Sequence, residues 1–148
     1  MPSVLEVAEA LADALENVSP QFTMTVEPRM VFAPAADACI DIFPANPAEG
    51  DLAFGKTPRI YWFTIRLRVP TNDPDGAQDF LYAARDADGP ESVRAALLYD
   101  ETLGGVADGL LFDANTPSGF YLSTDTTTDG PRYLAEDWRV GVLVRGDS

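Results

Sequence analysis

Acidic side chains are the most numerous groups in this chain that could do chemistry. The segment 71–79 places Asp73 and Asp75 ahead of a glycine, as in the first part of a calcium-binding loop. The rest of that pattern is missing, because Thr71 stands at the first ligand position and Tyr82 where a bidentate glutamate is needed. A capping carboxylate at the start of a helix explains Asp73 better, and we expect no bound metal.

Motifs for nucleophilic or nucleotide chemistry are absent from the sequence. The chain has no histidine, so the usual proton shuttle is missing. It has no Gly-x-Ser-x-Gly elbow and no Ser-x-x-Lys pair, and Gly104 and Gly105 lack the lysine of a phosphate-binding loop. The single thiol, Cys39, excludes an internal disulfide and argues against a zinc site. Paired carboxylates for sugar hydrolysis need a fixed separation that a sequence does not reveal. We therefore predict that the chain is not an enzyme and uses no cofactor.

Arginines concentrate in two long apolar segments, 59–69 and 134–145. In each segment they alternate with large apolar residues, which predicts a strand with one face in the core and the other charged or solvated. The arginines in or beside these strands are Arg59, Arg66, Arg68, Arg139 and Arg145. Two interpretations stay open at this point: contacts between copies of the chain, where arginine is favoured, or ion pairing and solvation within one copy.

The elements that would position these residues follow from periodicity and capping signals. Residues 3–17 predict an amphipathic helix with capping-box spacing between Ser3 and Glu6. The other expected elements are strands at 22–27, 38–43 and 59–69, helices at 73–85 and 91–98, a strand within 109–123 interrupted near Pro117, and the closing strand 134–145. This order predicts one α+β domain over 1–148. Its antiparallel or mixed sheet is packed on one face by the N-terminal helix and the central helix pair.

The charge of the chain limits its partners. There are 24 acidic and 10 basic residues, which give a net charge of −14. Such a surface repels DNA phosphates and anionic membranes, so neither is expected to bind. The charge suits simple solubility, or a surface that lies near DNA without binding it. The sequence shows no signal peptide and no run of about 18 apolar residues, so we expect a cytosolic origin and no membrane span.

The order of elements resembles the tail terminator proteins of long-tailed bacteriophages. The resemblance rests on the N-terminal helix 4–17, the long strand 59–69, the helix pair 75–85 and 91–98, the turn at Leu103-Gly-Gly, and the closing strand 138–144. It covers nearly the whole chain. Members of that family are small α/β proteins that cap the tail tube and meet the head-completion proteins, and they have no catalytic site.

This resemblance implies a structural function in the virion, with assembly in the host cytoplasm. The implied partners are further copies of the chain in a ring, typically a hexamer, the tail tube protein, and a head-completion or neck protein. DNA would pass through the lumen without specific binding. The implied subunit contacts are Arg66, Arg68, Arg139 and Arg145. The implied docking residues, in the segments 44–58 and 124–131 that we expect to be flexible, are Phe54, Lys56, Asp125 and Asp129.

Other interpretations stay open. Another neck or minor tail component of similar size would have much the same sequence features. A small-ligand-binding or enzymatic α+β domain would instead be a monomer or dimer with a pocket of converging polar groups. An inhibitor that mimics DNA would need acidic residues along one exposed face, and the arginine-bearing strands count against it.

Overall fold

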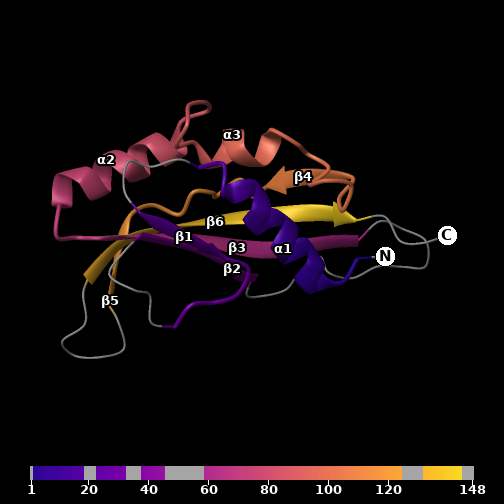
Figure 1. The fold of residues 1–148 in the computed structure, drawn as a ribbon, viewed down its shortest axis with the longest axis horizontal. Coiled ribbons are helices and arrows are strands. Elements are labelled where there is room, and N and C mark those ends of the chain that lie inside the picture. Colours follow the sequence, from indigo (N-terminus) through magenta and orange to yellow (C-terminus); the bar gives the residue numbers. More distant parts are fainter. Residues whose placement is uncertain (1, 19–22, 33–37, 46–58, 125–131, 145–148) are drawn as a thin grey trace.

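The computed structural model describes residues 2–18, 23–32, 38–45, 59–124 and 132–144 (Figure 1). In chain order the elements are α1 (Val4–Leu15), β1 (Met24–Glu27), β2 (Ala38–Pro44), β3 (Arg59–Pro70), α2 (Pro74–Arg85), α3 (Val93–Leu98), β4 (Gly109–Phe112), β5 (Tyr121–Thr124) and β6 (Arg132–Val144). No helix within these residues is long and apolar enough to span a membrane.

The strands form one mixed sheet, which confirms the predicted α+β class. The order across the sheet is β1-β2-β3-β6-β4, and β5 pairs with another part of β6. Among the strand pairs of the described residues, β1 and β2 run parallel to each other and the others are antiparallel. The two arginine-bearing strands lie side by side at the centre, with Arg59 opposite Val144 at one end and Pro70 opposite Tyr133 at the other. The central position of this pair fits its length and its apolar face.

The segment 109–123 forms two strands instead of one continuous strand. β4 pairs with residues 140–143 of β6, whereas β5 pairs with residues 132–135. The chain between them contains a cis peptide bond before Pro117. The predicted interruption of the strand near this proline is therefore confirmed. β4 and β5 pair with different parts of β6.

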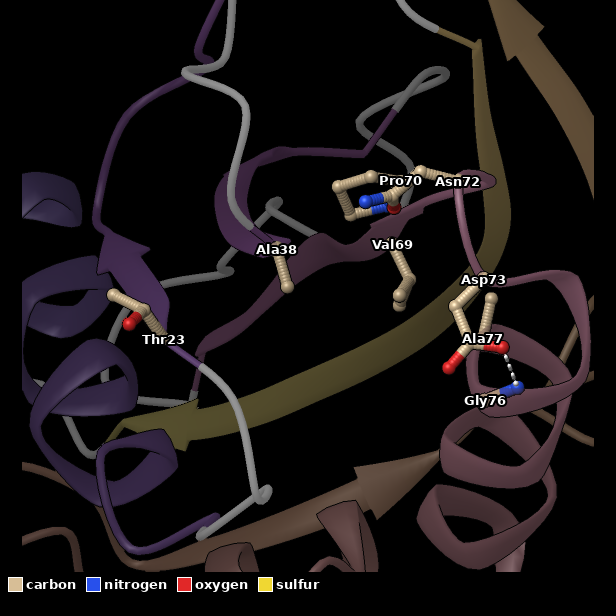
Figure 2. A pocket seen from close by; sticks show the side chains of 8 residues that line it. All are labelled: Thr23, Ala38, Val69, Pro70, Asn72, Asp73, Gly76 and Ala77. Carbon is tan, nitrogen blue, oxygen red and sulfur yellow. Dashed lines mark hydrogen bonds between the residues drawn. The ribbon is translucent and has the colours of Figure 1, made fainter.

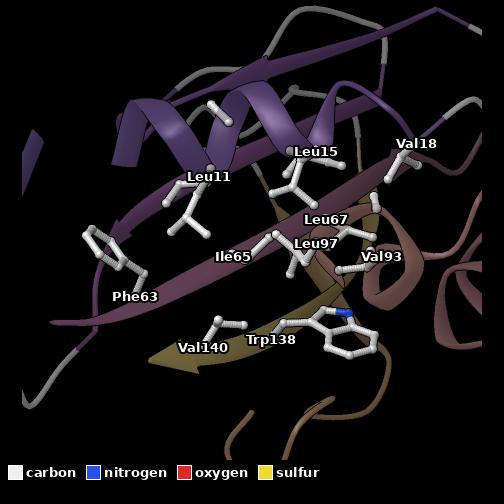
Figure 3. Close-up of a cluster of buried hydrophobic side chains, with 14 of the residues drawn as sticks. Leu11, Leu15, Val18, Phe63, Ile65, Leu67, Val93, Leu97, Trp138 and Val140 are labelled. Atoms are coloured by element: carbon white, nitrogen blue, oxygen red, sulfur yellow. The ribbon is translucent and has the colours of Figure 1, made fainter. Parts of the chain in front are cut away.

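The hydrophobic core lies between one face of the sheet and the helices. Phe63 and Ile65 of β3 stand opposite Val140 and Trp138 of β6, and all four are buried. Leu11 and Leu15 of α1 and Val93 and Leu97 of α3 pack into the same cluster (Figure 3). Burying one such side chain stabilises the fold by about 1.5–3 kcal/mol, so this layer supplies much of the driving force. The closing strand β6 therefore lies beside the long central strand β3 and shares its core face.

Caps at the helix starts agree with the expected signals. The Ser3 hydroxyl accepts from the backbone N of Glu6 at 3.1 Å, and a carboxylate oxygen of Asp73 accepts from the backbone N of Gly76 at 3.1 Å. A Cβ at Gly76 would lie 2.3 Å from that carboxylate, so glycine lets the cap approach closely. Asp73 is thus a helix cap. Among the described residues, no three acidic, histidine or cysteine side chains come together as a metal site.

Candidate functional site

The sheet face turned away from the core carries the arginines and is the strongest candidate for a functional surface. Residues of β3 alternate between the two faces, so Tyr61, Phe63, Ile65 and Leu67 enter the core. The opposite face, here called the helix-free face, carries Trp62, Thr64, Arg66 and Arg68 of β3 and, opposite Thr64, Arg139 of β6. The pairing of β3 with β6 thus brings Arg66, Arg68 and Arg139 onto one face of the sheet.

Asp41 of β2 lies fully buried on the helix-free face and binds two of these arginines. Nη2 of Arg66 donates to its Oδ2 at 2.6 Å and Nε to its Oδ1 at 3.1 Å; Nη2 of Arg68 donates to Oδ2 at 3.1 Å. Oδ2 also accepts from the backbone N of Val31 at 2.9 Å. Nη2 of Arg68 donates in turn to the carbonyl oxygen of Val31 at 2.9 Å. This Asp41 cluster therefore attaches the chain beyond β1 to the middle of the sheet.

Arg66 also contacts an aromatic ring and keeps its positive charge in the cluster. Its guanidinium lies 5.2 Å from the ring centroid of Phe43, a cation–π distance. Burial lowers the pKa of Arg66, but the hydrogen bond and negative charge of Asp41 outweigh burial and raise the pKa overall. The guanidinium therefore stays charged, and its side chain is 20% exposed.

A second polar pair on this face joins β5 to β6. The phenol of Tyr121 donates to Oδ1 of Asp137 at 2.6 Å, and Asp137 stands opposite Arg66 in the sheet. Burial raises the pKa of Asp137, and the hydrogen bond from the phenol and the nearby arginine only partly offset it. Burial and the hydrogen bond to Asp137 also raise the pKa of Tyr121. Each proton is held more tightly than in an unfolded chain.

Arg139 makes a third group at the other end of the face. Its Nη1 donates to Oδ2 of Asp113 at 2.9 Å, and its guanidinium lies 4.6 Å from the ring centroid of Trp62. A Cβ at Gly141 would lie 3.0 Å from atoms of the Trp62 ring and from Ile60, so glycine at this position leaves room for the indole. A polar hollow of about 280 Å³ lies beside this group, between β3, β6 and the chain after β4.

The sequence left two interpretations of the arginines open: contacts between copies, or ion pairing within one copy. The structure shows the ion pairing within one copy. Arg66, Arg68 and Arg139 all form ion pairs within the chain. Arg68 is 5% exposed and presents little surface to a partner, whereas Arg66 and Arg139 keep 20% and 31% of their side chains exposed. A role of these arginines in subunit contacts stays a prediction. Arg145, Phe54, Lys56, Asp125 and Asp129 lie outside the described residues.

Two buried carboxylates were missed by sequence reasoning. Asp41 is one, and the other is Glu136, which is fully buried on the core side of β6 and binds Arg85 of α2. Burial raises the pKa of Glu136 despite the opposing effect of Arg85. The signal in the sequence was an acidic residue inside an apolar strand, but its partner depends on which strands are neighbours.

Further hollows lie on other parts of the described surface, and two of them have contrasting linings. One, of about 230 Å³, is bounded by the start of β2, the end of β3 and the first turn of α2, with Asn72 and Asp73 on its lining (Figure 2). The other is a groove of about 570 Å³ between α1 and the chain after α3, lined in part by Glu6, Glu9 and Asp100. The smaller hollow has a mostly apolar lining, whereas the groove is acidic.

Comparison with known proteins shows no family for this chain. No family model matches the chain, and no curated protein matches it. One solved structure, known only by a serial designation, shares 19% identity over 97% of this chain and 96% of its own, with a TM-score of 0.41. At that score the likeness carries no argument about function.

Proposed function

We propose that this chain is a structural subunit of a phage tail that caps the tail tube and joins it to the head-completion or neck proteins. The observation that carries the proposal is the helix-free face. It leaves part of Arg66, Arg139 and Tyr121 exposed on a broad sheet surface. Arginine and aromatic residues are enriched at the centres of protein interfaces, so this face suits contact with another protein.

The polar groups of the described chain support a structural function. The Asp41 cluster, the Arg139–Asp113 pair and the Arg85–Glu136 pair each tie two elements together. An enzyme site needs such groups to converge on an open cavity, with a nucleophile or proton carrier free to act. These groups instead fix the relative positions of strands and helix, which is what a subunit of a rigid assembly needs.

The net charge supports placement near DNA. A ring of such subunits multiplies a charge of −14 around its lumen, and phosphate groups passing through are repelled from its wall. The hexamer, the tail tube protein, the neck protein and the virion location come with the resemblance to tail terminators. Another neck or minor tail component is the alternative within the same structural class.

The test is the mass of the chain in solution. Light scattering at low and high protein concentration, followed by negative-stain imaging, should find closed rings with six-subunit mass. A monomer or dimer at every concentration, with a small molecule bound in one of the hollows, would favour the ligand-binding alternative.

A further inference from the structure

The chain directly after β1 presents an exposed aromatic on a fixed backbone. Val31 is held by the Asp41 cluster through both its N–H and its carbonyl oxygen, at 2.9 Å each. Its neighbours point outward: Met30 is 42% exposed and Phe32 is 78% exposed. Arg29 is also exposed and forms no ion pair with any residue that the structure describes. Residues 29–32 are here called the arm.

A buried charge cluster is an unusual support for an exposed phenylalanine. Burying Asp41 and Arg68 removes two charges from water, which costs free energy even when the pair is well formed. The cluster fixes the backbone beside Phe32 in advance, so binding through that ring loses little conformational entropy. A fixed, exposed aromatic near an arginine that forms no ion pair with the described residues has the composition of an interface centre.

The same chain carries a hollow of suitable size for an aromatic ring. It measures about 230 Å³, and Ala38, Val69, Pro70 and Ala77 form its apolar part (Figure 2). For comparison, an apolar cavity of about 150 Å³ is known to bind benzene. Acidic groups stand at its edge, since Asp73 lines the hollow and the exposed Asp75 follows in the first turn of α2.

We propose that the arm docks onto a second copy of this chain, with the Phe32 ring in that copy's hollow and Arg29 beside the acidic start of its α2. A second copy is the favoured occupant because the hollow, the ring and the complementary charges all belong to this one sequence. Copies with a charge of −14 repel one another, so a contact is favoured where an arginine without an ion pair to the described residues, such as Arg29, meets acidic groups of the other copy. The inference rests on the self-association in the proposed function and names its residues.

Such a contact joins two different surface patches. The arm follows β1, whereas the hollow lies where β2, β3 and α2 meet. Contacts between unlike patches run head to tail and close into a ring when the rotation between subunits allows it. The proposed contact is therefore of the kind that builds a ring, whereas a contact between like patches would stop at a dimer.

The experiment is cross-linking between two singly labelled chains. Both carry Cys39→Ala, which removes the native thiol; one adds Met30→Cys in the arm, which keeps the Phe32 ring, and the other, with a longer tag, adds Asn72→Cys at the edge of the hollow. Each chain then has one thiol, so a short bis-maleimide can join Met30→Cys to Asn72→Cys only between copies. The control pairs Asn72→Cys with Tyr99→Cys, since Tyr99 is 86% exposed and lies elsewhere.

Docking raises the local concentration of the two thiols into the millimolar range, so at about 10 µM protein the mixed product should form about 100 times faster than the control product. Arg29→Glu should slow the reaction, and adding Asp75→Arg on the other chain should restore it. Equal rates for the two pairs, or no mixed product, would overturn the proposal. If rings form without the mixed product, the proposed contact is wrong and the proposed function still stands. If the mixed product forms but the protein does not bind tail tubes, the contact stands and the proposed function is wrong.

Discussion

Replacing Asp41 by asparagine should destabilise the chain more than any other single loss of charge among the described ion pairs. Asp41 is fully buried, and Arg68 beside it is 5% exposed, so the variant leaves a buried guanidinium without its counter-charge. Removing one partner of a buried ion pair costs about 3–5 kcal/mol. Arg66, at 20% exposed, is partly solvated, which places the expected loss near the lower end, about 3 kcal/mol.

Urea denaturation followed by tryptophan fluorescence measures this loss, since the chain has two tryptophans. A domain of this size is stable by about 5–15 kcal/mol, so a loss of about 3 kcal/mol shifts the midpoint clearly. The matched control is Asp113→Asn, which breaks the more exposed pair with Arg139 and should shift the midpoint much less.

A second variant distinguishes the cost of leaving a buried charge unpaired from the cost of losing the hydrogen bonds of Asp41. Asp41→Leu combined with Arg66→Met and Arg68→Met removes the charges together and should be more stable than Asp41→Asn alone. The reasoning is refuted if Asp41→Asn costs no more than Asp113→Asn, because the arginines would then be adequately solvated without Asp41.

Two further predictions concern single residues of the helix-free face. Gly141→Ala would place a Cβ 3.0 Å from the Trp62 ring and from Ile60, and should cost about 1–3 kcal/mol in urea denaturation; an unchanged midpoint would show that the indole moves aside freely. Burial raises the pKa of Asp137, so the folded chain keeps a proton that the unfolded chain has lost, and stability should fall as pH rises from about 4 towards the raised value. In Asp137→Asn the free energy of unfolding should depend less on pH in this range. An unchanged pH dependence would mean that other titrating groups cause it.

Local patterns predicted the elements well because they depend on neighbours in the sequence. The capping serine at position 3 and the capping aspartate at position 73 mark helix starts, and both caps are present. Alternation in β3 assigned each side chain to the correct face of the sheet. These signals depend on periods of two or 3.6 residues and need no knowledge of the tertiary fold.

The sequence did not predict which strands are neighbours in the sheet, or which side chains meet across them. The alternation places Arg66 and Arg68 on one face but does not show that β2 brings Asp41 opposite them. In the same way, the pairing of Glu136 with Arg85 depends on α2 lying over β6. Parallel pairing of β1 with β2 is also a non-local property, since the residues that meet are about 14 apart in the chain. The sequence did not predict the arm for the same reason, because the contacts that fix Val31 come from the cluster on the sheet.

The most direct test of the proposed function is electron microscopy of purified tail tubes of the long-tailed phage proposed to encode this chain, incubated with the protein and with an antibody to it. The account predicts a ring-shaped density with antibody label at one end of each tube. Labelling along the tube wall, or no labelling of either end, would contradict a subunit that caps the tube.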